Sequence, residues 1–281
     1  MTTKAKGSSV RQKLINLSVE LGIPFQNLET AFILERLVAR LTADEKLSKH
    51  LVFKGGFVGL KVYNSARYTV DVDALVVQAS VDSTLEHARA CAEKDLDDGV
   101  WFRFEDQVNL ATQGEYGGIR QTYRAGIGEV LTNLQRAQAV HFDVGVGDPV
   151  TPEPSLTQTA SLIIQESSLS WVVYPVETII AEKMHALIAH GNLNSRSKDV
   201  YDLGILLPKA RADVLALALR RCFEFRETQL PDSFTTVLRS MDTKSLERGW
   251  TSATASVRDK PKFQDTFDTI VIMINGIESS F

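Results

Sequence analysis

The sequence predicts an α+β protein, in which a small mixed sheet with helices is followed by a helical lobe. Short segments with a period near two fill the range Val100–Val146, and such alternation is typical of strands. Apolar residues recur at helical spacing before this range and almost throughout the chain after Pro175. The proline-rich stretch 148–155 has the composition of a connector. We therefore expect an N-terminal domain over residues 1–155 and a mainly helical lobe over residues 156–281.

Two helices and a short strand are expected first. Residues Val10–Leu21 show a helical pattern, and Asn27 is placed to cap a longer helix. That second helix carries apolar residues at helical spacing, at Ala31, Leu34, Leu37, Val38 and Leu41. The apolar run Leu51–Phe53 predicts a short strand, and Phe57–Tyr63 predicts the helix that follows it.

Strands dominate the next part of the chain. A strand over Asp71–Val77 and a helix over residues 82–95 are expected before three further strands, over Trp101–Val108, Gln121–Ala125 and Ala139–Val146. We expect these three to be largely antiparallel, because no helical crossover separates them. One more strand is predicted near Ser170–Tyr174, and helices then continue to the end of the chain. The last helix carries an apolar stripe made by Phe267, Ile270, Ile274 and Ile277.

The composition indicates where the protein is located and whether disulfides or zinc sites are expected. The chain has 281 residues, of which 44% are hydrophobic and 23% charged, as in ordinary globular proteins. Residues Met1–Ser9 lack the apolar core of a signal peptide, and no apolar stretch reaches the roughly 18 residues of a membrane helix. Neither Cys91 nor Cys222 has a Cys-x-x-Cys partner, and the histidines show no metal-ligand spacing. We therefore expect a cytoplasmic protein without membrane contact, disulfide framework or zinc site.

The net charge of −4 allows contact with nucleic acid only through a local basic patch. Candidates on the predicted C-terminal helices are Lys209, Arg211, Arg220, Arg221 and Arg226. A solvated helical face explains the same residues equally well.

Two aspartates share one face of a predicted strand. Residues two apart on a strand face the same way, so Asp71 and Asp73 lie on one side and Val72 on the other. Adjacent carboxylates repel each other unless a cation neutralises them. Hard oxygen ligands at this spacing suit Mg²⁺, which takes its remaining ligands from water and substrate phosphates. The alternative is a solvated pair at a frayed strand end.

The glycine pair Gly55-Gly56 favours the metal hypothesis. It lies between an apolar run and a helix, where free backbone N–H groups can hold an anion; the alternative is an ordinary tight turn. A phosphate-binding turn and a carboxylate pair together would hold a triphosphate between backbone donors and magnesium. Asp143 is the candidate third carboxylate, because it faces away from the apolar side of its strand. Its alternative role is a polar residue on the outer face of an antiparallel strand.

One lysine and one aspartate lie on apolar helical stripes. Lys183 projects from the stripe of the helix predicted over Pro175–His190. A buried ammonium is costly without partners, so Lys183 either extends to solvent or points into a polar cavity. Asp199 lies on the stripe of the next helix, whereas Asp202 lies nearer the edge and is the weaker candidate. Two misplaced charges on adjacent helices indicate that Lys183 and Asp199 line one polar cleft.

In order and residue type, these motifs resemble the AbiEii-type nucleotidyltransferases. This family is the toxin half of AbiE-like (type IV) toxin–antitoxin pairs and includes the mycobacterial MenT toxins. The similarity runs from roughly Leu51 to Leu207. It comprises Lys54-Gly55-Gly56, Arg67-Tyr-Thr-Val-Asp71-Val-Asp73, a later strand with Asp143, Glu182-Lys183, and Arg196-Ser-Lys-Asp199-Val-Tyr-Asp-Leu.

The resemblance implies a DNA polymerase β-like nucleotidyltransferase fold with a helical C-terminal lobe. It implies that Asp71 and Asp73 hold metal, that Lys183 binds triphosphate and that Asp199 completes the site. Known members transfer nucleotides to the acceptor end of tRNA or bind GTP, and a cognate antitoxin protein neutralises them. Two positions depart from the family pattern. Phe57 stands where a small hydroxyl residue is usual, and Thr69 stands where serine is common.

The predicted function is Mg²⁺-dependent transfer of a nucleotide from an NTP to an acceptor hydroxyl, with the tRNA 3′ end as the expected acceptor. The expected metal ligands are Asp71, Asp73 and Asp143. The expected nucleotide-binding residues are Lys54, Gly55, Gly56, Arg67, Thr69 and Lys183. The expected catalytic residues are Asp71, Asp73, Asp143, Lys183 and Asp199. Two alternatives stay open: transfer to a small molecule, as in antibiotic-modifying enzymes, and a non-catalytic fold that only binds a nucleotide or partner.

Overall fold

The chain divides into two compact units. The computed structural model describes residues 3–110, 118–165, 167–189 and 196–278. Unit 1 comprises Met1–Val58, Tyr68–Gly147 and Leu156–Val173, and unit 2 comprises Gly59–Arg67, Asp148–Ser155 and Tyr174–Phe281.

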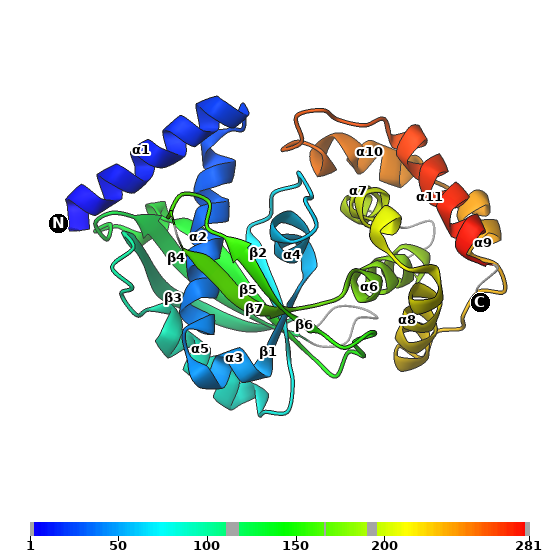
Figure 1. Cartoon of the computed structure of the whole chain (residues 1–281), viewed down its shortest axis with the longest axis horizontal. Coiled ribbons are helices and arrows are strands. Elements are labelled where there is room, and N and C mark those ends of the chain that lie inside the picture. Colours follow the sequence, from blue (N-terminus) through cyan, green and yellow to red (C-terminus); the bar gives the residue numbers. More distant parts are fainter. Residues whose placement is uncertain (1–2, 111–117, 166, 190–195, 279–281) are drawn as a thin grey trace. The chain divides into compact units, whose positions relative to one another are not determined.

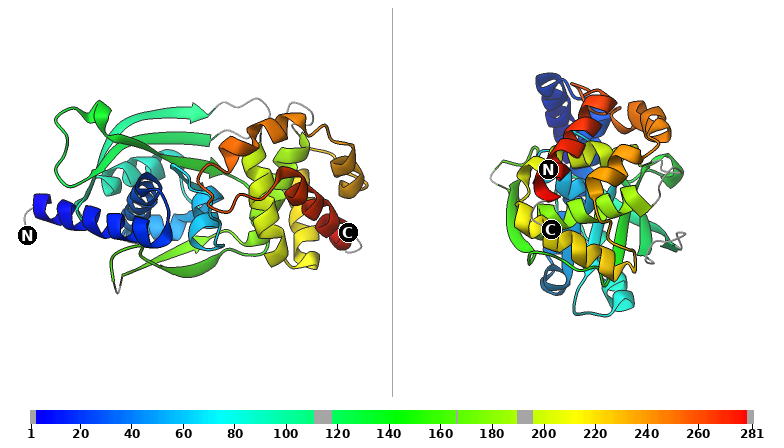
Figure 2. Two further views of the ribbon diagram at one scale, coloured as in Figure 1. Left: turned by 90° about the horizontal axis from the view of Figure 1, so that it is seen from above. Right: turned by 90° about the vertical axis from the view of Figure 1, so that its right-hand side faces the viewer.

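A seven-stranded mixed sheet forms the centre of unit 1, in the order β3-β4-β5-β2-β1-β7-β6 (Figure 1). The strands are β1 (Leu51–Lys54), β2 (Asp71–Val76), β3 (Val100–Leu110), β4 (Gly118–Ile127), β5 (Gln138–Val146), β6 (Ser155–Ala160) and β7 (Ser168–Val173). As predicted, β3, β4 and β5 pair in antiparallel fashion. Parallel pairing appears where β5 joins β2 and where β7 joins β1. The long strands β3 and β4 lie side by side in Figure 2.

The sheet confirms the predicted α+β class and most of the predicted strands. Strand β6 was not predicted, because its alternate positions are exposed or half-buried and so give no hydrophobic signal. The observed strands also extend several predicted ranges, most clearly for β4, which begins at Gly118 rather than at Gln121. That extension brings an arginine into the candidate site described below.

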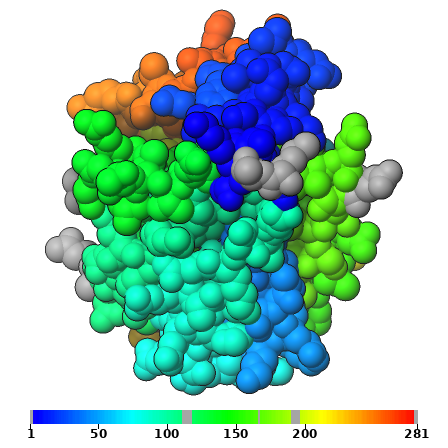
Figure 3. All heavy atoms as spheres, turned by 90° about the vertical axis from the view of Figure 1, so that its left-hand side faces the viewer, coloured from blue at the N-terminus to red at the C-terminus, as the bar shows by residue number. Residues whose placement is uncertain are grey.

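Five helices accompany the sheet in the described part of the N-terminal region: α1 (Thr3–Leu21), α2 (Phe25–Thr42), α3 (Glu45–His50), α4 (Gly55–Lys61) and α5 (Val81–Ala92). The predicted stripe of α2 is fully buried. The predicted cap by Asn27 is wrong, because the helix begins after Pro24 and no side chain caps it. Helix α1 lies against the segment after β4 (Figure 3). A Cβ on Gly7 would come 2.2 Å from the Cα of Gly128, so this approach needs glycine.

Unit 2 is helical, as expected for the C-terminal lobe. Its described helices are α6 (Val176–Ala189), α7 (Ser197–Leu206), α8 (Ala212–Phe225), α9 (Phe234–Ser240), α10 (Lys244–Ala253) and α11 (Phe263–Glu278). Their core contains aromatic edge contacts, such as Phe223 with Phe234 at 5.6 Å between ring centroids. The predicted stripe of the last helix is buried. The predicted end of α6 at His190 lies outside the described residues.

No helix in the described segments combines the length and the apolar composition that crossing a bilayer requires.

Candidate active site

A row of four charged residues crosses the centre of the unit 1 sheet. The register places Lys54 of β1 opposite Asp73 of β2, Asp73 beside Asp143 of β5, and Asp143 opposite Arg120 of β4. Directly paired residues on neighbouring strands project from the same face. The order of charges along this row is therefore positive, negative, negative, positive. The two carboxylates are flanked by one cation on each side.

A second row lies two residues away on the same face. It consists of Asp71 of β2, His141 of β5 and Thr122 of β4. The Thr122 hydroxyl is 3.3 Å from His141 Nδ1, which fixes the orientation of the ring. The backbone N–H of Asp71 donates to Thr69 Oγ1 at 3.3 Å. The two rows confirm that Asp71 and Asp73 share a face, as predicted, and show that Asp143 projects from that same face of the sheet.

Arg120 is the functional candidate that the sequence prediction missed. Its Nε and Nη2 atoms donate to the two carboxylate oxygens of Asp143 at 2.8 and 2.6 Å. Nη2 also lies 3.9 Å from Asp71 Oδ1. The hydrogen bond and the charge of Asp143 raise the pKa of Arg120, so the guanidinium stays protonated. The strand predicted from the sequence begins at Gln121 and so excludes Arg120, which lies two residues before Thr122 on the same face of β4.

Gly55 makes room for the carboxylate of Asp73. Its φ is +72°, a conformation that glycine adopts readily. A Cβ at this position would lie 2.0 Å from Asp73 Oδ2, far inside van der Waals contact. Glycine is therefore required here both by the backbone and by the neighbouring aspartate. Phosphate binding by Gly55 and Gly56 stays a prediction.

The departure from the family pattern at Phe57 has a packing explanation. Phe57 is fully buried, and its ring meets Trp171 edge-on at 5.8 Å between centroids. The side chain therefore belongs to the core of unit 1, where a serine or threonine would leave a cavity.

The donors in this face fit a hard divalent cation. Carboxylate oxygens are the ligands that Mg²⁺ prefers, and the side chain of Asp71 is 31% exposed and so accessible. Asp143 is less available, because Arg120 occupies both of its oxygens. Accordingly, the oxygens of the three aspartates do not all converge within 4.8 Å of one another, among the residues that the structure describes. Asp71 and Asp73 fit the cation as the structure stands, and metal binding by Asp143 stays a prediction.

A second charged cluster lies within unit 2. Lys183 Nζ on α6 is 2.7 Å from Asp199 Oδ1 and 2.7 Å from Asp202 Oδ2, both on α7. Arg67 holds Asp202 from the other side, with Nε and Nη2 at 3.0 and 2.7 Å from its two oxygens. Lys183 and Asp199 are therefore in direct contact, and the expectation that they line one polar cleft stays a prediction.

The sequence ranks Asp202 below Asp199, but the structure places both carboxylates at the same distance, 2.7 Å, from the ammonium of Lys183. Asp202 is 6% exposed and lies between Arg67 and Lys183, whereas Asp199 is 14% exposed and lies near Lys183 and, at 3.6 Å, near Arg196. Burial alone would raise the pKa of Asp202, but Lys183 and Arg67 lower it to about 2. Burial would likewise lower the pKa of Lys183, and Asp199 and Asp202 together raise it above its ordinary value. Arg67 is thus a buried ion-pair partner, and its contact with nucleotide stays a prediction.

The basic residues proposed for RNA contact have different environments. Arg226 is 13% exposed, and its Nη2 lies 3.3 Å from Asp148 Oδ1, so its charge is largely neutralised within unit 2. Arg211 is 66% exposed beside Glu177. Lys209, Arg220 and Arg221 are exposed, and Arg221 also donates from Nη1 to Thr151 Oγ1 at 3.0 Å. The exposed members are the ones able to meet a phosphate backbone.

Comparison with known proteins places these features in a family. The model for the nucleotidyl transferase AbiEii toxin of type IV TA systems matches residues 36–271. A crystal structure of a candidate nucleotidyltransferase from H. pylori is similar at a TM-score of 0.57 and 15% identity, covering 92% of this chain and 96% of that one. Helicobacter pylori JHP933 is similar at a TM-score of 0.56 and 15% identity, covering 92% and 94%. At such identity these two structures show the shared fold alone. No curated protein matches the chain.

Proposed function

We propose, since the chain belongs to the AbiEii family of nucleotidyltransferase toxins, that it transfers a nucleotide from a Mg²⁺-bound NTP to an acceptor hydroxyl. The observation that carries the proposal is the face of the sheet on which Asp71, Asp73 and Asp143 project together, with Gly55 leaving room for the carboxylate of Asp73. Such a set has little structural value of its own, because neighbouring carboxylates repel each other.

Asp71 and Asp73 would hold the cation on the side of the sheet where Asp71 is exposed. When bound, Mg²⁺ supplies positive charge that neutralises the phosphates and orients them for in-line displacement. Lys54, opposite Asp73, adds a cation at the edge of the same row. In the reaction, the acceptor oxygen forms a bond to the α-phosphorus while the bond from this phosphorus to the leaving oxygen breaks. Pyrophosphate leaves, and the acceptor hydroxyl gives its proton to solvent water.

Lys183 is proposed to bind the triphosphate, as the family resemblance implies. Asp199 and Asp202 already hold its ammonium at 2.7 Å each. A phosphate must therefore compete with two carboxylates for this charge. Asp199 is the more exposed of the two and is the one proposed to release Lys183.

The proposed acceptor is the 3′ end of tRNA, and the proposed partner is a cognate antitoxin protein. The family supports both proposals. Lys209 and Arg220 are exposed and could contact phosphates of an RNA. Binding through such contacts weakens as salt rises. RNA binding that does not change with salt would exclude a surface of this kind.

Incubation with each labelled NTP and total RNA tests the proposal. We expect one NTP to label RNA with the wild type and no labelling with Asp71→Ala. The matched control is Asp82→Asn, an exposed carboxylate on α5 of the same unit. Label on a small acceptor instead of RNA would establish the antibiotic-type alternative. Wild-type-like labelling by Asp71→Ala would refute the metal assignment, and failure of the wild type to bind Mg²⁺–NTP in calorimetry would favour a non-catalytic binding protein.

A further inference from the structure

Three different ligand atoms converge in unit 1, away from the charged rows. His87 and Cys91 are four residues apart on α5, so their side chains lie on the same side of that helix. Asp44, which caps the first turn of α3, approaches them. One nitrogen, one sulfur and one carboxylate oxygen of these residues all lie within 4.8 Å of one another. The sequence expectation that no histidine has metal-ligand spacing overlooked this pair, because its third member lies on another helix.

The contact between His87 and Asp44 lacks the geometry of a hydrogen bond. His87 Nε2 is 2.9 Å from Asp44 Oδ1. This nitrogen is nevertheless buried without a hydrogen-bond partner among the described residues. Two atoms that ligate one ion point at the ion and not at each other. Tetrahedral Zn²⁺ with bonds of about 2.0–2.3 Å brings its N, O and S ligands to roughly 3.3–3.6 Å apart. The three ligand atoms lie within 4.8 Å of one another, so small side-chain rotations would bring them to that arrangement.

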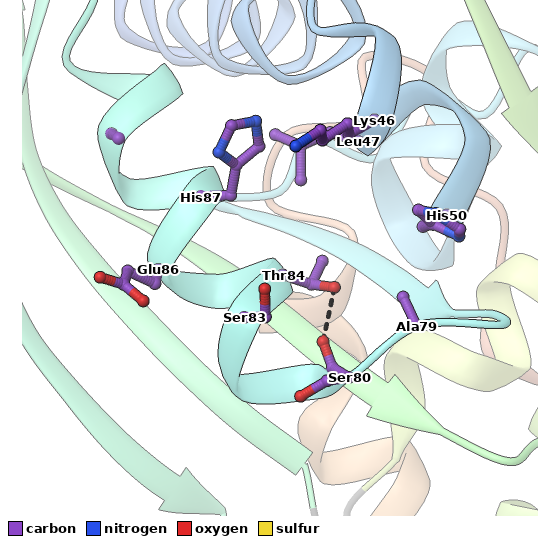
Figure 4. A pocket seen from close by; sticks show the side chains of 10 residues that line it. Lys46, Leu47, His50, Ala79, Ser80, Ser83, Thr84, Glu86 and His87 are labelled. Carbon is purple, nitrogen blue, oxygen red and sulfur yellow. Dashed lines mark hydrogen bonds between the residues drawn. The ribbon is translucent and has the colours of Figure 1, made fainter.

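We propose that Asp44, His87 and Cys91 bind a Zn²⁺ ion. Imidazole nitrogen and thiolate sulfur favour zinc over the hard cation expected at Asp71 and Asp73. The fourth ligand of this site is water. A cavity of about 420 Å³ adjoins it, and His87 forms part of the cavity wall together with Lys46, His50, Ser83 and Glu86 (Figure 4).

Lys94 takes the place of the ion when the site holds none. Its ammonium lies 3.3 Å from Cys91 Sγ and 3.8 Å from Asp44 Oδ2. The side chain is 56% exposed, so it leaves this position at little cost. An ion from solvent can reach the sulfur of Cys91 through the space that the Lys94 side chain occupies. Lys94 therefore competes with the metal for the same negative groups, and its removal strengthens metal binding.

Titration of the full chain with Co²⁺, followed by displacement with Zn²⁺, tests the site. Co²⁺ gives a thiolate charge-transfer absorption only if sulfur is a ligand, so ions held by Asp71 and Asp73 do not contribute to it. We expect this band at one equivalent in the wild type and in Cys222→Ser, which removes the other buried cysteine. Cys91→Ser should abolish it. His87→Gln and Asp44→Asn should weaken binding by about tenfold or more, because even changes to residues that only hydrogen-bond to metal ligands cost about 10–100-fold; the asparagine retains the helix cap.

The Lys94→Met variant separates a metal site from an ordinary ion-pair cluster. Loss of the competing ammonium should tighten Co²⁺ binding severalfold without changing the position of the charge-transfer band. Circular dichroism confirms that each variant is folded. Absence of the band in the wild type, or its persistence in Cys91→Ser, would overturn the proposal. Weaker binding by Lys94→Met would overturn the assignment of Lys94 as the competitor.

Discussion

Replacement of Asp202 by alanine tests how the buried charges of unit 2 are stabilised. The Asp202 carboxylate is 6% exposed and binds both Arg67 and Lys183. Its removal leaves Arg67 without this partner and leaves Asp199 as the one carboxylate near Lys183 in the part of the chain that the structure describes. Breaking a buried ion pair from one side costs about 3–5 kcal/mol. We therefore expect the free energy of unfolding to fall by about 3–5 kcal/mol, which lowers Tm by roughly 6–20 °C at about 2–4 °C per kcal/mol.

The matched comparison is Asp199→Ala, on the same helix. Asp199 is 14% exposed, and its removal leaves Lys183 paired with Asp202. We expect a loss of about 1–2 kcal/mol, the cost of one partly buried hydrogen bond. Urea unfolding followed by circular dichroism and by tryptophan fluorescence measures both variants. Trp250 reports on this region, because its ring lies 6.2 Å from that of Tyr201. Equal losses from the two variants would refute the central position assigned to Asp202.

Three further predictions follow from the same contacts. In Gly55→Ala, the new Cβ would collide with Asp73 and displace its carboxylate. We expect the rate of nucleotide transfer to fall roughly 100-fold, since displacing a reacting group by about 1 Å has this effect. A normal rate would show that the position of Asp73 is not critical. Arg120→Met should tighten divalent-cation binding, because it frees Asp143 and removes a positive charge from the row. Isothermal titration with Mg²⁺ measures the change. Unchanged affinity would contradict the competition between Arg120 and the cation for Asp143. The third prediction concerns the dependence of stability on pH. The pKa of Asp202 is lowered to about 2 from 3.8, so its contribution to the free energy of unfolding is fully present above about pH 4 and is lost as pH falls toward 2. Across this range the wild type should therefore lose about 2 kcal/mol more unfolding free energy than Asp202→Ala, at about 1.4 kcal/mol per pKa unit, in the same urea titrations at each pH.

The faces of the strands were predictable from the sequence, whereas their neighbours were not. Alternation with apolar residues places Asp71 and Asp73 on one side of β2 and Asp143 on the polar side of β5. This is a local property of a pleated strand. The parallel pairing of β2 with β5 joins segments about 70 residues apart, and no local pattern specifies it. The side-by-side position of Asp73 and Asp143 was therefore a hypothesis until the sheet order was known.

The errors in the candidate site have the same origin. A helical stripe shows that Asp202 lies near the edge of the apolar face of α7, but not that Arg67, 135 residues earlier, packs against that edge. Likewise, the four-residue spacing of His87 and Cys91 is visible in the sequence, but the approach of Asp44 depends on the packing of α3 beside α5. The contacts of charged residues with partners far away in the sequence are thus the feature that the sequence predicts least well.

The most direct test of the central claim is Mn²⁺ binding in the presence of NTP, followed by electron paramagnetic resonance. Mn²⁺ replaces Mg²⁺ at oxygen ligands, and its resonance signal gives the number of bound ions. If Asp71 and Asp73 hold the catalytic cation, the wild type and Cys91→Ser bind Mn²⁺–NTP equally well. Asp71→Asn and Asp73→Asn should each bind it at least about tenfold more weakly. Wild-type affinity in both asparagine variants would contradict the account.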